Sequence, residues 1–374
     1  MSNSKPRVLF VSSVLENVDT GPGKFAKILY DHSDFDDIEM YFLSEDVKVE
    51  SNNVFNLRKR LGSKKIGYIE RNILIYKKLH RLNKVYGFDI VWCNFANEGL
   101  LAALLLKRIV HVGMINDDSS VDANIFKRTT RRELRYWLLG LLESLTCRIF
   151  DKIIVNSNYL KKRVSDHYQV DHSKVCLLYK SVEIPVFSTF CRKEFGSIIK
   201  LAFMKSDFLR GGVFVLVDAL GRLNFDFEVN LIGPDETLLR ESGFYKNLSS
   251  NIRIINHGKL SQNRVIEVLK ICDIFCTPSI KEALGVANME AMALKVPVVY
   301  SNAGGINEVM DFGNNGFISE PGDPVSLSQA LLLCISNSRL REMKSLSGYN
   351  FILKYFHKDL MLYNYVGLCK DFSR

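Results

Sequence analysis

Long hydrophobic runs are missing from this sequence of 374 residues. The longest apolar run covers residues 100–106, whereas a helix needs about 20 apolar residues to span a bilayer. The apolar run over residues 8–15 ends at Glu16 and favours a strand, because Lys5 and Arg7 alone make a poor targeting segment. We therefore expect a cytoplasmic protein that is soluble, or peripheral at the inner face of a membrane.

Clustered cysteines are also missing, although the chain has eight. Only Cys272 and Cys276 lie close in sequence, and neither a second pair nor a nearby histidine cluster completes a zinc site. Their neighbours are apolar, so we expect buried and reduced thiols, as in the cytosol. The sequence also lacks helix-turn-helix, zinc-finger and RNA-binding aromatic motifs, so we expect no nucleic-acid partner.

The composition is that of a globular protein, with 47% hydrophobic and 24% charged residues. The length predicts two domains. Apolar strand candidates alternate with helix candidates along both halves, which predicts an α/β fold with parallel sheets and right-handed crossovers. The net charge of +9 indicates an anionic partner, such as a phosphorylated substrate or an anionic membrane.

The most informative stretch runs from Thr277 to Pro321. It follows a predicted strand at 274–277 and contains a helix at 286–294 that is rich in alanine and methionine. A second strand follows at 297–300, and two glycines at 304–305 open another helix. A strand, loop and helix in this order place polar loop residues above the carboxyl ends of parallel strands, where α/β folds bind ligands.

Two glutamates in this stretch, Glu282 and Glu290, lie eight positions apart around Gly285. Glycine allows close approach of backbone to a ligand, and the free amides at a helix start favour an anion such as a diphosphate. A carboxylate accepts two hydrogen bonds, which suits neighbouring sugar hydroxyls. The alternative is a pair of solvated glutamates on an amphipathic helix. The surrounding strand and helix order favours a ligand site.

This stretch resembles the signature of retaining glycosyltransferases of family 4, the glycosyl transferases group 1, which have the GT-B fold. The matching residues are Pro278, Ser279, Glu282, Leu284, Gly285, Glu290–Ala293, Pro297–Val299, Gly304, Gly305, Glu308, Asn315–Phe317 and Pro321–Asp323. The resemblance covers nearly the whole chain and is strongest over residues 198–335.

The resemblance implies two doubly wound Rossmann-like domains that face a central cleft. Residues 1–190 form the N-terminal, acceptor-binding domain, and residues 191–356 form the C-terminal domain that binds the nucleotide-sugar donor. Residues 357–374 form a C-terminal helix that crosses back to the N-terminal domain.

Two cations, Lys205 and Arg210, lie on the loop after a predicted strand at 198–204. Placed between a strand end and a helix start, they can converge on one spot and neutralise a diphosphate. The alternative is a pair of exposed surface cations. Relatives usually have arginine first and lysine second, so this chain reverses the two types but keeps both charges.

The resemblance implies transfer of a sugar from a nucleotide diphosphate with retention at the anomeric carbon. Lys205, Arg210 and Glu282 are the catalytic candidates: the two cations stabilise the departing diphosphate, and Glu282 contacts the sugar. Glu290 is expected to bind the ribose diol. The remaining donor contacts are expected from amides or nearby turns at Leu284, Gly285, Val286 and His257. No Asp-x-Asp placement supports a metal, so we expect neither metal nor cofactor.

A glycine-containing loop, Gly21-Pro22-Gly23, precedes a helix predicted at 24–30. It can bring amides to phosphates or be an ordinary turn. The third glycine of a dinucleotide fingerprint is absent, because position 26 is alanine, which argues against an NAD enzyme with Glu45 on the ribose. Within the resemblance, Gly21 and Gly23 face the donor across the cleft.

On the acceptor side, the predicted strand at 109–115 ends at Asn116 and Asp117. Many relatives have a histidine just after this strand, so these two residues are the candidates for its role. His111 lies inside the strand, and we expect it to pack or point away.

Two basic segments, at 58–84 and 127–135, lie in the half that the resemblance assigns to the acceptor. The first becomes an amphipathic helix pattern from Ile66 onward, and the second precedes Tyr136 and Trp137. Each is a solvated helix face or a contact with an anionic membrane or lipid acceptor, and their shared location favours the contact.

The sequence therefore predicts a retaining hexosyltransferase that moves a sugar from a nucleotide diphosphate-sugar to a hydroxyl of a glycan or lipid-linked glycan. Synthesis of a cell-surface polysaccharide such as lipopolysaccharide is the expected setting. A nucleotide-sugar epimerase of the same fold is one alternative. A non-catalytic partner subunit is another, although Glu282, Glu290 and both cations are present.

Overall fold

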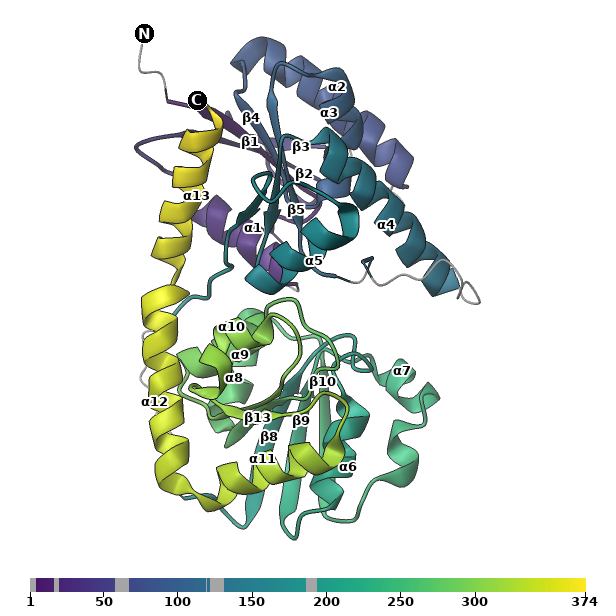
Figure 1. The fold of residues 1–374 in the computed structure, drawn as a ribbon, viewed down its shortest axis with the longest axis vertical. Coiled ribbons are helices and arrows are strands. Elements are labelled where there is room, and N and C mark those ends of the chain that lie inside the picture. The colour runs from purple at the N-terminus through teal and green to yellow at the C-terminus, as the bar shows by residue number, and fades with distance from the viewer. Residues whose placement is uncertain (1–4, 17–19, 58–66, 119, 122–130, 186–193) are drawn as a thin grey trace. The chain divides into compact units, whose positions relative to one another are not determined.

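A computed structural model describes residues 5–16, 20–57, 67–118, 120–121, 131–185 and 194–374 (Figure 1). The chain forms two compact units, residues 1–180 with 359–374, and residues 181–358. Most of the expected linker at 186–197 and the basic residues at 58–65 and 127–130 lie outside the described residues. Within the described ranges, no helix is both long and apolar enough to cross a bilayer.

The first unit contains a seven-stranded parallel sheet in the order β3-β2-β1-β4-β5-β6-β7. Its strands are β1 (Arg7–Ser12), β2 (Glu39–Ser44), β3 (Val54–Asn56), β4 (Ile90–Cys93), β5 (Val110–Ile115), β6 (Lys152–Val155) and β7 (Val175–Leu177). The strand order reverses between β1 and β4, which makes the carboxyl ends of these two strands a topological switch point.

The helices of the first unit connect these parallel strands. They are α1 (Gly21–Asp31), α2 (Tyr68–Tyr86), η1 (Ala96–Gly99), α3 (Leu100–Leu105), α4 (Arg131–Ile149), α5 (Asn158–Tyr168) and α13 (Lys358–Phe372). Local sequence explains several of their ends. Ser157 caps α5 by accepting a hydrogen bond from the Leu160 amide, and Gly87 ends α2 in the left-handed region at φ 64°.

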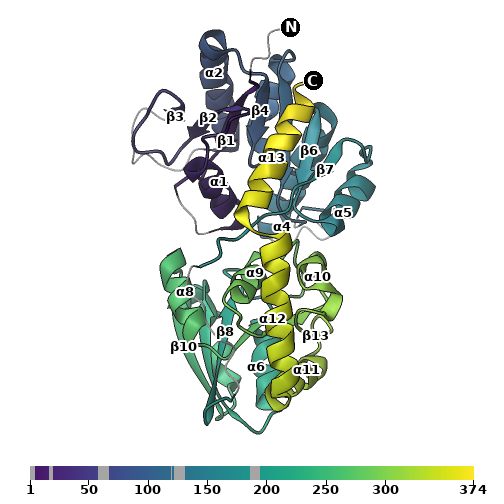
Figure 2. The ribbon, with the colours of Figure 1, turned by 90° about the vertical axis from the view of Figure 1, so that its left-hand side faces the viewer.

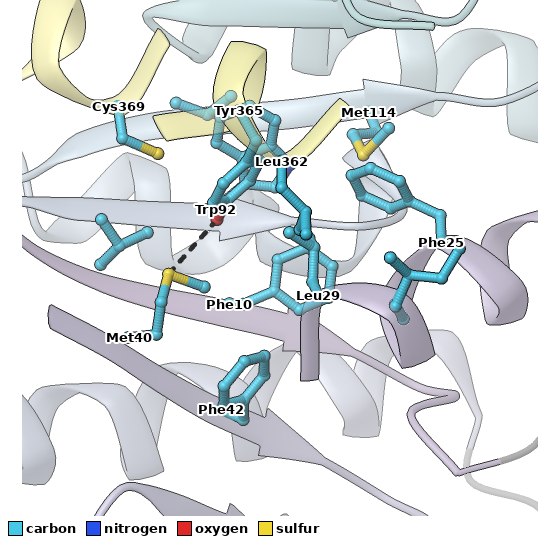
Figure 3. Packing of buried hydrophobic residues seen from close by; sticks show 14 of the residues in the cluster. Phe10, Phe25, Leu29, Met40, Phe42, Trp92, Met114, Leu362, Tyr365 and Cys369 are labelled. Atoms are coloured by element: carbon cyan, nitrogen blue, oxygen red, sulfur yellow. Dashed lines mark hydrogen bonds between the residues drawn. The ribbon is translucent and has the colours of Figure 1, made fainter. Parts of the chain in front are cut away.

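The last helix, α13, packs on the first unit as part of its core (Figures 2 and 3). Tyr365 is fully buried against Trp92 of β4, with ring centroids 4.5 Å apart. Its hydroxyl lies 3.8 Å from the sulfur of Met40 on β2. These contacts join residues from the two ends of the chain, so the first unit needs α13 to complete its core.

The second unit contains a six-stranded parallel sheet in the order β10-β9-β8-β11-β12-β13. Its strands are β8 (Ile198–Met204), β9 (Asp226–Ile232), β10 (Ile252–Gly258), β11 (Ile274–Thr277), β12 (Val298–Ser301) and β13 (Phe317–Ser319). The strand order reverses between β8 and β11. A second switch point therefore lies where Lys205 follows β8 and Pro278 follows β11.

The helices of the second unit start mostly from loops that follow these strands. They are α6 (Val213–Gly221), α7 (Glu236–Glu241), η2 (Phe244–Asn247), α8 (Gln262–Ile271), α9 (Val286–Ala293), α10 (Ile306–Val309), η3 (Asp311–Gly313), α11 (Pro324–Ser336) and α12 (Ser338–Tyr355). Cys272 and Cys276 are buried and form no disulfide, as their apolar neighbours predict. The two sheets confirm the predicted α/β class with two Rossmann-like domains.

The structure corrects several expected boundaries. Helix α1 begins at Gly21 instead of Lys24, because Thr20 caps it by accepting a hydrogen bond from the Gly23 amide. The basic amphipathic helix begins at Tyr68 instead of Ile66. The sequence analysis did not predict the short strands β3 and β13 or the long helix α4.

Candidate active site

The switch point of the second unit brings together two of the predicted catalytic residues. Lys205 follows β8, Glu282 lies on the loop after β11, and these two strands are neighbours in the sheet. The ammonium Nζ of Lys205 forms an ion pair with carboxylate oxygen Oε2 of Glu282. Their side chains are 27% and 19% exposed, so solvent and a ligand can both reach the pair. An incoming anion can therefore compete with Glu282 for the lysine.

The loop that carries Arg210 is held against the loop after β11. The Arg210 carbonyl accepts a hydrogen bond of 2.9 Å from the Ile280 amide, and the Arg210 amide lies 3.3 Å from Oδ1 of Asp207. Gly212 has φ 76°, and a Cβ added there would lie 2.0 Å from the Pro278 carbonyl oxygen. Only glycine permits this approach, which sets the path of the backbone beside Arg210.

The start of α9 lies beside the same edge of the sheet. Gly285 precedes the helix at φ 92°, and a Cβ there would meet Ile306 at 3.0 Å. The Gly305 amide donates a 3.0 Å hydrogen bond to the Glu282 carbonyl, so the loop is fixed at both ends. The first amides of a helix have no partner within the helix, and those at Val286 and Ala287 are thus suited to bind an anion. Leu284, two residues before α9, is buried.

Glu290 lies one turn into α9 and is only 6% exposed. Its oxygen Oε1 accepts a hydrogen bond of 3.1 Å from Nε2 of Gln262, the first residue of α8. The sequence analysis did not single out Gln262, because its partner lies 28 positions away and no local pattern links them. This contact sets the orientation of the carboxylate that the resemblance assigns to the ribose.

His257 lies near the end of β10, and its ring nitrogen Nε2 is 2.8 Å from Oδ1 of Asn230. The Asn230 amide nitrogen points to the Leu201 carbonyl at 3.4 Å, so its oxygen faces the histidine. Nε2 must then donate, which leaves Nδ1 as an acceptor. Burial lowers the pKa of His257, so the ring is neutral at neutral pH. Asn230 is a second residue that the sequence analysis missed.

In the first unit, most backbone amides of the predicted glycine loop cannot donate to a phosphate. Pro22 has no amide hydrogen, the Gly23 amide donates to Oγ1 of Thr20, and the Lys24 amide donates to the Thr20 carbonyl. A phosphate bound here would compete with the cap of α1. The donor contact expected of Gly21 and Gly23 stays a prediction.

Asparagines directly follow three strands of the first sheet, and their amide nitrogens link the strand ends. Asn94 donates to Oγ of Ser12 at 3.0 Å, Asn116 to the Asn94 carbonyl at 2.7 Å, and Asn156 to the Asn116 carbonyl at 2.9 Å. The side-chain amide nitrogen of Asn116 is therefore already used in linking the carboxyl ends of β4 and β5. Asp117 is exposed and is the more accessible of the two acceptor-side candidates.

His111 lies inside β5 and away from this edge. It is 2% exposed, and its Nε2 lies 3.1 Å from the Leu106 carbonyl. Burial lowers the pKa of His111, so it is a neutral packing residue, as its position in the strand predicts.

Two buried glutamates of the first unit were not expected. Burial raises the pKa of Glu98 to about 7, although Arg71 lies 3.4 Å away and acts in the opposite direction. Arg71 also pairs with Glu45. This corrects the prediction that Arg71 belongs to the basic face of the amphipathic helix, because two carboxylates hold it and its side chain is 25% exposed. The same pair argues further against Glu45 as a ribose ligand.

Glu143 of α4 is the second buried acid. It accepts hydrogen bonds from the hydroxyls of Ser120 and Tyr168, the latter at 2.8 Å. Burial raises the pKa of Glu143 to about 7. The negative charge of Asp117 also raises the pKa of Glu143, so the two carboxylates are near each other.

Comparison with known proteins finds two family models that match this chain. The model of glycosyl transferases group 1 matches residues 196–350, which contain the Lys205, Glu282 and Glu290 positions. The model of Glycosyltransferase Family 4 matches residues 42–184. The chain belongs to glycosyltransferase family 4. Its two parallel sheets are thus the two domains of the GT-B fold.

Two relatives of this chain differ in how much of it they match. An uncharacterized glycosyltransferase of Methanocaldococcus jannaschii is 27% identical over 327 residues, which cover 85% of this chain and 86% of the relative. The phosphatidyl-myo-inositol mannosyltransferase of Mycobacterium leprae is 30% identical over 152 residues, 39% of each chain.

A solved structure with a similar fold is the Anabaena protein HepE in complex with UDP-glucose. It has a TM-score of 0.72 and 15% identity, with 98% of this chain and 99% of that chain covered. At 15% identity, this similarity establishes that the present glycosyltransferase has the same fold as HepE.

Proposed function

We propose that this glycosyltransferase moves a hexose from a nucleotide diphosphate-sugar to a hydroxyl of a glycan or lipid-linked glycan, with retention at the anomeric carbon. The observation that carries the proposal is the Lys205–Glu282 ion pair at the β8–β11 switch point, next to the start of α9. The complex of the similarly folded HepE with UDP-glucose supports a donor of this class.

In the proposed reaction, the diphosphate replaces Glu282 as the partner of Lys205. The bond between the anomeric carbon and the diphosphate oxygen breaks, and negative charge develops on that oxygen. Lys205 and Arg210 stabilise this charge, while Glu282 turns to the hydroxyls of the transferred sugar. The acceptor oxygen bonds to the anomeric carbon from the face that the diphosphate leaves. The acceptor proton passes to the leaving diphosphate, so neither a glutamate nucleophile nor a metal is required.

The remaining donor contacts follow the chemistry of each group. Glu290, fixed by Gln262, accepts hydrogen bonds from the ribose diol. The amides around Gly285 bind a phosphate or the sugar. His257 presents the acceptor nitrogen Nδ1 to the nucleoside end of the donor. On the acceptor side, the exposed Asp117 is the proposed partner of the attacking hydroxyl.

We also propose that the first unit contacts an anionic membrane that carries the acceptor. Helices α2, α3 and α4 are neighbours in the first unit (Figure 1) and expose apolar side chains. This α2–α4 patch has seven members that are 38–73% exposed: Ile69, Ile73, Leu104, Leu105, Leu138, Leu141 and Leu145. Lys77 of α2 is exposed, as are Lys107 and Arg108, which follow α3. Apolar side chains among cations suit an anionic lipid surface.

Donor hydrolysis tests the proposed activity. The wild type and Glu290→Ala would be incubated without acceptor with a panel of UDP-, GDP-, dTDP- and ADP-sugars. Release of free sugar and nucleotide diphosphate from one donor, lost in the variant, is the expected result. Conversion of the donor into an isomer would indicate an epimerase, and no turnover or binding of any donor would favour a partner subunit. Proton NMR of the glycoside formed with an acceptor would report retention.

Vesicle sedimentation tests the membrane contact. We expect binding to vesicles of phosphatidylcholine with phosphatidylglycerol and weak binding to phosphatidylcholine alone. Leu138→Ser combined with Leu141→Ser should weaken binding. The matched control combines Leu332→Ser with Leu333→Ser, which alters two similarly exposed leucines of α11 in the second unit. Equal losses in both double variants would contradict a specific patch.

A further inference from the structure

Gln262 makes a contact that the proposed reaction does not yet explain in full. It is the first residue of α8, and its Nε2 donates to Oε1 of Glu290 at 3.1 Å. Its other polar atom, Oε1, is buried, and within the part of the chain that the structure describes it has no hydrogen-bond partner. A folded protein rarely leaves such an oxygen without a donor, so a bound molecule is expected to supply one.

Helix α8 can form without the contact between Gln262 and Glu290. Ser261 precedes α8 with extended backbone and without a side-chain hydrogen bond to the helix, so the start of α8 does not depend on the Gln262 carboxamide. A glutamine side chain loses considerable rotational freedom when it is held in one orientation. Holding it with one atom unsatisfied costs more, which argues for a role outside folding.

We propose that Gln262 positions Glu290 and itself accepts a hydrogen bond from the ribose of the nucleotide donor. This inference rests on the proposed function. The carboxamide nitrogen uses one N–H on Glu290, and the carboxamide oxygen is the acceptor that still lacks a donor. A carboxylate is an acceptor only, so the two side chains together present acceptors side by side. Two neighbouring hydroxyl donors, as in the 2′,3′-diol of a ribonucleotide, match that arrangement.

The expected consequence is discrimination between ribose and deoxyribose. A site built to accept a hydroxyl hydrogen bond binds the analogue without that hydroxyl poorly, because a buried acceptor is then left unpaired. We expect the wild type to bind a ribonucleotide diphosphate at least about tenfold more tightly than its 2′-deoxy analogue. Removal of the Gln262 carboxamide should bring this ratio of dissociation constants close to one, mainly because the ribonucleotide then binds more weakly.

Isothermal titration calorimetry with UDP, dUDP, GDP and dGDP tests this on the full chain. The main variants are Gln262→Ala and Gln262→Met, and the second keeps most of the side-chain volume. Asn263→Ala is the matched control, because Asn263 is the exposed next residue of the same helix. The control should keep the wild-type ratio. Thermal unfolding of each variant confirms that it is folded.

Two further variants separate positioning from direct contact. In the Glu290→Ala background, Gln262→Ala should still weaken ribonucleotide binding if the glutamine oxygen contacts ribose, and should have no further effect if it acts only through Glu290. Gln262→Glu places two carboxylates together, so ribonucleotide binding should strengthen as the pH falls and one of them is protonated. A wild-type pH profile in Gln262→Glu would contradict the positioning role.

The outcomes distinguish this inference from the function on which it rests. If the wild type binds a ribonucleotide diphosphate and both main variants keep its preference over the deoxy form, the inference is overturned and the proposed function stands. If the wild type binds none of the four nucleotides and hydrolyses no donor in the panel above, the proposed function fails, and this inference fails with it.

Discussion

Replacement of Lys205 by methionine separates catalysis from stability at this site. Methionine keeps the apolar stem and removes the charge that pairs with Glu282. With side chains 27% and 19% exposed, the pair is partly screened by solvent, so it contributes about 1 kcal/mol or less to folding. A cation placed at a developing oxyanion contributes about 3–4 kcal/mol to the transition state. The variant should therefore lose about 100–1000-fold in kcat and shift Tm by only about 2–4 °C.

The assay is steady-state hydrolysis or transfer with the donor found in the panel, together with thermal unfolding. Lys205→Arg, which installs the residue type usual among relatives, keeps the charge and should retain more activity than Lys205→Met. Glu282→Gln removes the negative charge that pairs with Lys205. This variant should lower kcat, because the Glu282 carboxylate is the proposed contact of the transferred sugar. A folded Lys205→Met variant whose kcat stays within about tenfold of the wild type would refute the assignment of the leaving group to this lysine.

Three further predictions concern the fold around the site. Gly212→Ala should destabilise the protein by about 2–4 kcal/mol and reduce donor turnover, since the new Cβ meets the Pro278 carbonyl at 2.0 Å. Gly322→Ala has the same φ of 76° with nothing within 4 Å and should cost only about 1 kcal/mol in chemical denaturation. Tyr365→Ala should cost about 3–5 kcal/mol and lower Tm, because a fully buried ring leaves the first unit's core. The pKa of Glu98, raised to about 7, lies above its unfolded value, so this group's contribution to stability falls as pH rises from about 4.5 to 7. The Tm difference between Glu98→Gln and wild type should then grow with pH over that window, and a constant difference would contradict the buried-acid assignment.

Much of the fold could be predicted from local pattern. The bounds of β8 and β11 agree with those predicted from the sequence, because apolar runs are properties of neighbouring residues. The short strand β13 was missed, since three residues carry too little pattern. The start of α1 was misplaced because a cap depends on one side chain, Thr20, rather than on periodicity.

The candidate site could be predicted in part. Lys205 and Glu282 were chosen from separate loops, and their ion pair follows from β8 and β11 being neighbours in the sheet. Gln262, Asn230 and Glu98 could not be found in this way. Each contacts a side chain 27 or 28 positions away, and a single sequence holds no record of such pairs.

The α/β class, the order of most elements and the family signature around Glu282 and Glu290 could be predicted without a structure, because they depend on the local spacing of residue types. The contacts between polar side chains could be identified only in the folded chain. In the structure, Gln262 donates a hydrogen bond to Glu290, and Arg71 pairs with Glu45 and Glu98. The side-chain amide nitrogen of Asn116 donates to the Asn94 carbonyl at the carboxyl end of the sheet. Hydrogen bonds and ion pairs depend on distances of a few ångströms, and strand order and helix packing set those distances.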